Sequence, residues 1–319
     1  MCRKFFVFMF FLVFCARAGA EVYDLENALR ATYNNCVGIE DSLRDMKVMA
    51  GVNTAITGVG TGLGIGAVVA GVEKKKVDAE IEEKFNTLEK LAYGASSDVD
   101  TIDEEEWLKV FEQNNESAGN FKSSEPNDNK NKTQEIRSLT EKSKKLGKWR
   151  TGLLAGNTAT NIAGAVISGA NKVDLSLSEQ IQNCKLAVQN LQKSIAQAEL
   201  DDVDVSEGLK IADACKGFLY IDDNSIAKIN NRAKGGMVSS VVGVGTGVVG
   251  VITSALANSD KIRRDNSQKD KEKNLNTAAN VLATGSSVAS ATATVFNATQ
   301  IKAIKDIYVV AEHCTEALR

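Results

Sequence analysis

The sequence predicts an all-α protein made of two long antiparallel helical hairpins, which together form a four-helix bundle. Three observations lead to this fold class. The 319 residues include a single proline, so little in the chain interrupts a helix. Four long blocks, rich in Gly, Ala, Ser and Thr, carry no charged side chain. The segments that flank these blocks repeat apolar residues at the alternating spacing of three and four that is typical of coiled coils.

Residues 1–20 have the pattern of a signal peptide. Arg3 and Lys4 precede an apolar run that ends at Cys15, and Ala18-Gly19-Ala20 supplies the small residues that a signal peptidase requires. We therefore expect the mature chain to be exported, with cleavage after Ala20. The first hairpin then covers residues 21–200 and the second covers 201–319.

The four blocks without Asp, Glu, Lys, Arg or His form the centres of the expected helices. They are residues 48–72, 151–171, 235–259 and 274–301. Each is long enough to cross the hydrocarbon core of a bilayer, which needs about 17 to 25 residues. A helix on the surface of a soluble protein carries charges on its outer face. The blocks therefore favour a membrane location, with lipid as a partner and both termini on the periplasmic or extracellular side.

The first and third blocks are rich in valine and glycine. Gly58, Gly62 and Gly66 recur every four residues in the first block, and Gly243 and Gly247 do so in the third. In water each glycine costs a helix about 1 kcal/mol relative to alanine, whereas in a membrane a bare stripe lets a partner helix approach closely. The pattern resembles the glycine zippers of membrane-embedded helices. This resemblance implies close helix packing at these glycines and allows self-association of the chain.

The second and fourth blocks are more polar. They place Asn157, Asn161, Asn280, Thr284 and Ser287 in helices that carry no charge. In a bilayer such side chains turn toward each other or toward water, because an unpaired polar group in hydrocarbon costs several kcal/mol. Two arrangements satisfy this requirement. The side chains hold the four helices together as a closed bundle, or they form the neutral polar lining of a pore.

The cysteine positions predict the register of the hairpins. If Cys36 pairs with Cys184 across two antiparallel helices, paired residue numbers add up to 220, and residues 48–72 lie opposite 148–172. The second block coincides with that range to about one helical turn. Pairing of Cys215 with Cys314 aligns the other two blocks more loosely, and it requires a bend or an insertion near residues 217–223. We therefore predict the disulfides Cys36–Cys184 and Cys215–Cys314 in an oxidising compartment.

The remaining segments complete the two hairpins. The predicted coiled-coil flanks place cysteines on the seam between helices, where a disulfide can form. Residues 73–150 form a charged insertion in the first hairpin, with a helix to about residue 91 and a polar tract at 113–132 that is too poor in apolar residues to order itself. Internal duplication is suggested by the pentapeptide at residues 58–62, which recurs at 243–247.

The composition also bears on function. A single histidine, His313, leaves few candidates for a general base and no pair of histidines for a metal site, so we expect neither catalytic residues, nor a cofactor, nor a metal. Lys and Arg number 38 against 41 Asp and Glu, which gives no basic footprint for nucleic acid. The sequence favours an exported, membrane-embedded structural or interaction protein. The alternative is a secreted soluble helical rod that serves as a binding or scaffold module.

Overall fold

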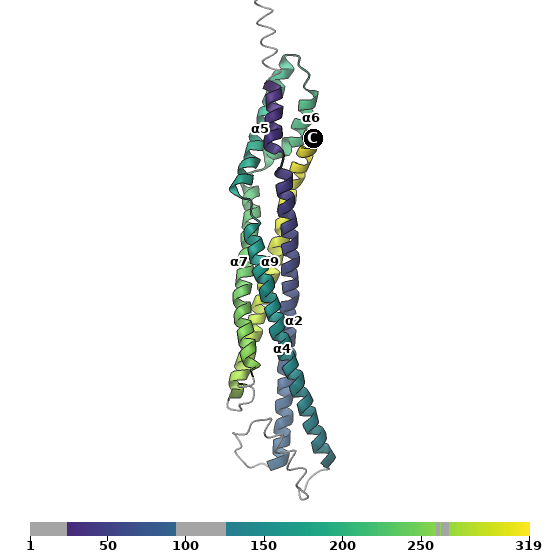
Figure 1. Cartoon of the computed structure of the whole chain (residues 1–319), viewed down its shortest axis with the longest axis vertical. Helices are drawn as coiled ribbons and strands as arrows, with labels where there is room; N and C mark the ends of the chain where they lie inside the picture. Colours follow the sequence, from purple (N-terminus) through teal and green to yellow (C-terminus); the bar gives the residue numbers. More distant parts are fainter. Residues whose placement is uncertain (1–23, 94–125, 260–261, 263–267) are drawn as a thin grey trace, which may run out of the picture. The chain divides into compact units, whose positions relative to one another are not determined.

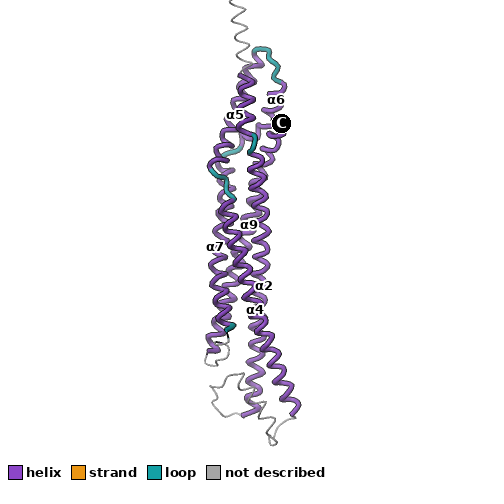
Figure 2. Tube along the Cα trace, viewed as in Figure 1, coloured by secondary structure: helices purple, strands orange, loops and turns teal. Residues whose placement is uncertain are grey.

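The structure is a computed structural model, and it describes residues 24–93, 126–259, 262 and 268–319. These residues are helical and contain no β-strand, which confirms the all-α prediction (Figures 1 and 2). A first helix covers residues 24–36. The others are α2 (Ile39–Tyr93), α4 (Pro126–Ala170), α5 (Leu175–Leu200), α6 (Ser206–Cys215), the 3-10 helix η1 (Lys216–Tyr220), α7 (Asp223–Ala257) and α9 (Lys269–Leu318). The predicted signal peptide and residues 94–125 of the insertion lie outside the described residues.

Specific residues end and begin these helices. Gly38 has φ +95°, a left-handed conformation that favours glycine, and it separates the first helix from α2. Asp174 caps α5, because its Oδ1 accepts a hydrogen bond of 2.7 Å from the backbone N–H of Leu177. The bend expected after Cys215 is present as η1 and the short loop before α7. Helix α4 begins at Pro126, inside the tract predicted to lack order.

The chain divides into two compact units. Unit 1 takes its residues from Met1–Thr54, Ile167–Gly236 and Val295–Arg319, and unit 2 takes its residues from Ala55–Val166 and Met237–Thr294. The division falls within the long helices, so it runs across both predicted hairpins instead of between them. The two hairpins as separate sequence units, and the internal duplication, stay predictions.

Unit 1 has a large core of aliphatic side chains. The predicted seam residues Ile39, Leu43 and Ala50 are fully buried, as are Val188 and Leu191 of α5. The end of α9 contributes Ile304, Ala311 and Cys314 to the same core. Phe218 of η1 is also fully buried there. Unit 1 therefore has an aliphatic core built from the seam residues of its helices.

Unit 2 keeps the register that the cysteines predict. Its α2 and α4 segments run antiparallel, since Gly66 lies against Leu153 and Gly71 against Arg150. Segments of α4 and α9 run parallel, and their hydrogen-bonded partners Asn157–Ser286 and Asn161–Ser290 are both 129 residues apart. Helix α7 contacts α9 where Ser286 Oγ donates a hydrogen bond of 3.0 Å to the backbone oxygen of Gly243.

Candidate functional site: a polar core under an apolar surface

The centre of unit 2 is polar. Asn157, Asn161, Ser286 and Ser290 are fully buried between α4 and α9. Asn157 Nδ2 donates to Ser286 Oγ at 2.9 Å, and Asn161 Nδ2 donates to Ser290 Oγ at 2.9 Å. Ser290 Oγ lies 2.8 Å from Asn157 Oδ1 and 3.0 Å from Asn161 Oδ1. These four side chains therefore satisfy each other across the seam, and we call them the polar seam.

Glycines of α2 and α7 make room for these side chains. A methyl group added at Gly64 would lie 2.8 Å from Asn157 Nδ2, and one added at Gly243 would lie 2.6 Å from Asn161 Cγ. Real side chains do not approach this closely, so any other residue would displace an asparagine. The bare backbone of α2 and of α7 thus packs directly against the asparagines of α4.

The predicted packing glycines divide between the inside and the outside of unit 2. Gly243 and Gly247 face inward, and Gly66 packs against Leu153. Gly58 and Gly62 face open space, with no heavy atom within 4 Å of an added methyl group. Gly60 and Gly64 take the inward role in α2 instead. In the first copy of the pentapeptide the middle glycine therefore faces inward, whereas in the second copy the first and last glycines do.

The predicted polar-lining residues also divide. Asn157, Asn161 and Ser287 are buried, and the Ser287 hydroxyl donates to the backbone oxygen of Ala283 at 2.7 Å. Asn280 is half-buried and accepts a hydrogen bond from Arg150. Thr284 is exposed, and its hydroxyl donates to the Asn280 backbone oxygen of the same helix. Thr284 therefore does not join the polar core.

A charged network closes one end of the polar core. The Arg150 side chain is fully buried, and it donates from Nε to Ser254 Oγ at 2.9 Å and from Nη2 to Asn276 Oδ1 at 2.8 Å. Lys74 is also fully buried, with Nζ 2.5 Å from Asp78 Oδ2 and 3.3 Å from Glu272 Oε1. Two interior cations are thus offset by two carboxylates and by neutral acceptors.

Sequence reasoning missed this network. Lys74 belongs to a run of three lysines and Arg150 follows Lys148 and Trp149, so both stand in basic clusters beside the ends of the blocks. One available signal was the spacing of Lys74 and Asp78, which suits an ion pair on one helix face. The partners from α7 and α9 are distant in sequence and give no local signal.

The outer surface of unit 2 is apolar over the charge-free blocks. Its exposed side chains include Val69 at 62%, Val166 at 67%, Val281 at 66% and Val288 at 60% relative exposure. The other exposed aliphatic side chains over the blocks of this unit are Val59, Ile65, Val72, Ile162, Val238, Val241, Val242, Val248, Val249, Ile252 and Leu256. Over its blocks, unit 2 therefore exposes aliphatic side chains and buries asparagine and serine beside a small apolar cluster of Ala67, Leu154 and Ala283.

Two of the described helices are long and apolar enough to cross a membrane by length and composition. They are the helical segments Asp24–Thr87 and Asp223–Ala257, which contain the first and the third block. In the most apolar 18-residue stretch of each helix, 33% is buried within the chain. Most of that apolar surface is thus available to the surroundings.

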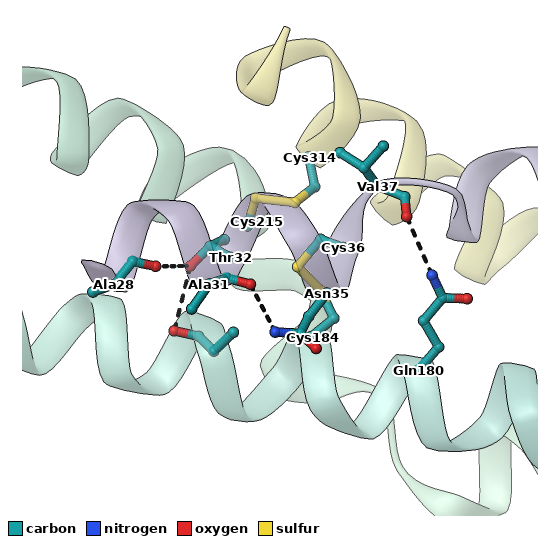
Figure 3. The surroundings of a disulfide bond; sticks show 11 residues. Ala28, Ala31, Thr32, Asn35, Cys36, Val37, Gln180, Cys184, Cys215 and Cys314 are labelled. Carbon is teal, nitrogen blue, oxygen red and sulfur yellow. Dashed lines mark hydrogen bonds between the residues drawn. A yellow bond between two sulfur atoms is a disulfide. The ribbon is translucent and has the colours of Figure 1, made fainter. Parts of the chain in front are cut away.

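Both predicted disulfides are present in unit 1, and Figure 3 shows them side by side. Cys36 is joined to Cys184 and Cys215 to Cys314, with Cα atoms 4.8 and 4.4 Å apart. The Sγ atoms of Cys36, Cys184 and Cys314 lie within 4.8 Å of one another, and all four cysteines are buried. Disulfides of this kind indicate an oxidising, extracellular or periplasmic environment. No family model matches the chain, and comparisons with curated proteins and with solved structures find no match either.

Proposed function

We propose that this chain is an exported, membrane-embedded structural protein, with its four charge-free blocks in the bilayer and its disulfides in an oxidising compartment. The observation that carries the proposal is the distribution of residues over the blocks of unit 2, where amides are buried and valines are exposed. Buried Asn157 and Asn161 lie beneath exposed Val166 and Val288. In water the exposed valines would not gain the stabilisation of apolar burial, which is about 25 cal/mol per Å² of surface. In lipid the same arrangement leaves valine in hydrocarbon and amides satisfied by one another.

The exposed threonines of the blocks support a lipid environment. Thr277, Thr284 and Thr292 on the outer face of α9 each donate to a backbone oxygen four residues earlier, at 2.8 to 2.9 Å. A threonine that bonds to its own helix needs no water to satisfy its hydroxyl. The polar composition of the fourth block is therefore compatible with a helix that faces lipid.

The charges next to the blocks support one orientation. Lysines at residues 74–76, 142–148 and 269–273 cluster at the ends of the blocks away from the disulfides along the sequence, whereas the opposite ends carry fewer basic residues, namely Lys47, Lys172, Arg232 and Lys234. Basic residues are retained on the inner side of a membrane. With all four blocks spanning, both termini and both disulfides lie outside, where disulfides persist.

Of the two arrangements considered, a closed bundle and a pore, the polar seam supports the closed bundle. Its asparagine and serine side chains are bonded to each other, and glycines bring the helices too close for a larger gap. A pore lined by these residues would require several copies and the loss of these bonds. We propose a structural or interaction role without enzymatic activity.

A secreted helical rod is the second candidate. Helices α4 and α9 are not among the two described helices that are apolar enough to cross a membrane. In this alternative the exposed valines contact a protein partner or further copies of the chain instead of lipid.

A charge placed on the valine surface separates the two candidates. Val288 is exposed near the centre of the fourth block, and Leu186 on α5 is exposed to 56% within unit 1. A charged residue at the centre of a spanning helix costs about 3 kcal/mol. We expect Val288→Glu to lower the fraction of chain retained in the membrane pellet after carbonate extraction, and Leu186→Glu to leave it unchanged. Equal release of both variants and of the unsubstituted chain into the supernatant would support the rod.

A further inference from the structure

Exposed lysines of three helices lie at the level where the apolar surface of unit 2 ends. They are Lys75 and Lys76 of α2, Lys145 and Lys148 of α4, and Lys271 and Lys273 of α9, and we call them the lysine girdle. Their common level follows from contacts between their neighbours. Lys74 Nζ lies 3.3 Å from Glu272 Oε1, and Arg150 Nη2 lies 2.8 Å from Asn276 Oδ1. Three helices thus present lysines within a few residues of these contacts.

The acidic groups at this level are largely occupied by other cations. Asp78 and Glu272 bind the buried Lys74, and Glu73 lies 3.4 Å from Lys142 Nζ. Glu80 of α2, Glu141 of α4 and Asp270 of α9 are exposed acidic residues near this level, fewer than the six lysines of the girdle. The buried charges therefore balance inside the unit, and the girdle leaves an excess of positive charge on its surface.

Trp149 marks the boundary between the two surfaces. Its side chain is exposed to 71%, beside Lys148 and next to the start of the second block. Val72, exposed to 46%, ends the apolar surface of α2 immediately before the lysines of that helix. Tryptophan is enriched at the headgroup level of membranes because its ring is amphipathic. The order valine, tryptophan, lysine matches the order hydrocarbon, interface, headgroup.

We propose that the lysine girdle binds the headgroups of anionic phospholipids. This inference rests on the membrane location proposed above and adds the lipid class. Lysine suits the ligand, since its ammonium is a compact charge on a long flexible stem that reaches phosphate oxygens from several directions. Lysines near an anionic membrane surface contribute additively and lose their effect at high salt.

Fluorescence quenching of Trp149 by brominated lipids tests the proposal. The chain has 2 tryptophans, so the substitution Trp107→Phe leaves Trp149 as the single fluorescent tryptophan. Two vesicle preparations hold the same mixture of phosphatidylcholine and phosphatidylglycerol, with bromine on one lipid or on the other. We expect quenching per mole of brominated lipid to be at least about fivefold stronger for phosphatidylglycerol at low salt. The preference should disappear in 0.5 M salt, on the order of the concentration that screens surface charges within a few ångströms.

Charge-neutral variants assign the preference to the girdle. Lys75→Gln, Lys148→Gln and Lys271→Gln remove one lysine from each helix, and a second variant with only the first and third leaves the neighbour of Trp149 intact. Lys193→Gln, Lys210→Gln and Lys228→Gln are the matched control, with three exposed lysines of unit 1. We expect the girdle variants to lose most of the preference and the control to keep it.

The outcomes separate the two proposals. A chain that floats with phosphatidylcholine vesicles but is quenched equally by both lipids overturns the girdle and leaves the membrane location standing. A preference that survives in both girdle variants also overturns it. A chain that floats with neither kind of vesicle overturns the membrane location and the girdle together.

Discussion

At the scale of single residues, unit 2 is held by a match between glycine and asparagine. Asn161 occupies the space beside Gly243, and Asn157 occupies the space beside Gly64. Hydrogen bonds to serines of α9 then satisfy both amides. Close packing of small residues and hydrogen bonds between helices can replace the hydrophobic effect, which is absent between helices in lipid.

The paired glycines Gly243 and Gly245 test this match. Gly243→Ala places a methyl group 2.6 Å from Asn161 Cγ, whereas Gly245→Ala places one in open space. We expect the first change to lower the free energy of unfolding by about 1–3 kcal/mol. The second should leave it unchanged or raise it by up to about 1 kcal/mol, since alanine favours a helix. Thermal unfolding in detergent, followed by circular dichroism, measures both, and equal effects would contradict the match.

Arg150 should be the most sensitive charged residue in the polar core. Arg150→Met removes the donor that Ser254, Asn276 and Asn280 share. Buried acceptors without a donor cost about 1–3 kcal/mol each, so we expect a loss of about 3–5 kcal/mol. Lys193→Met, at an exposed position of unit 1, should change the free energy by less than about 0.5 kcal/mol. Thermal unfolding measures both variants. An unchanged free energy of unfolding for Arg150→Met would mean that the network does not stabilise the fold.

At the scale of helices, register was predictable and rotation about the helix axis was not. In each predicted hairpin the cysteine pair aligns the two charge-free blocks, closely in the first and more loosely in the second, because both features are set by distance along the chain. The face that each glycine presents depends on the phase of the helix. Gly58 and Gly243 occupy equivalent places in the same pentapeptide, yet the first faces outward and the second inward. Identical local sequences cannot encode this difference, which follows from contacts with α4 and α9.

The cap of α7 gives a prediction about pH. Ser225 donates its hydroxyl and its backbone N–H to Asp222 Oδ1 at 2.7 and 2.8 Å, and these hydrogen bonds lower the pKa of the Asp222 carboxyl. Because the folded pKa is lower than the unfolded one of about 3.9, the ionised cap stabilises the fold above about pH 5. That stabilisation is lost as the pH falls through the folded pKa.

Substitution of the cap partner checks this prediction. Ser225→Ala removes the hydroxyl donor, so we expect the pKa of Asp222 to rise toward its ordinary value. Asp204 provides an internal control, since the backbone N–H of Ser206 lowers its pKa independently. Carboxyl titration by NMR measures both groups in one sample. An unchanged pKa of Asp222, or a matching rise at Asp204, would argue against the cap.

At the scale of the whole molecule, the two units differ in the side chains that make up most of their interiors. Unit 1 buries leucine and isoleucine around two disulfides, whereas unit 2 buries asparagine and serine under exposed valine. The sequence indicates this difference through the charge-free blocks, which stop near the boundary between the units. It could not indicate that Lys74 and Arg150 lie inside, because their partners come from other helices.

Contact between the exposed valines and lipid is the central claim, and nitroxide accessibility measures it most directly. Labels at positions 59, 166, 241 and 288 replace exposed aliphatic residues of unit 2, and labels at 186 and 193 report on unit 1. In vesicles, the account predicts frequent collisions with oxygen and rare collisions with a water-soluble nickel chelate at the first four positions, and the reverse at the last two. Collisions with the nickel chelate that are equally frequent at all six positions would contradict it.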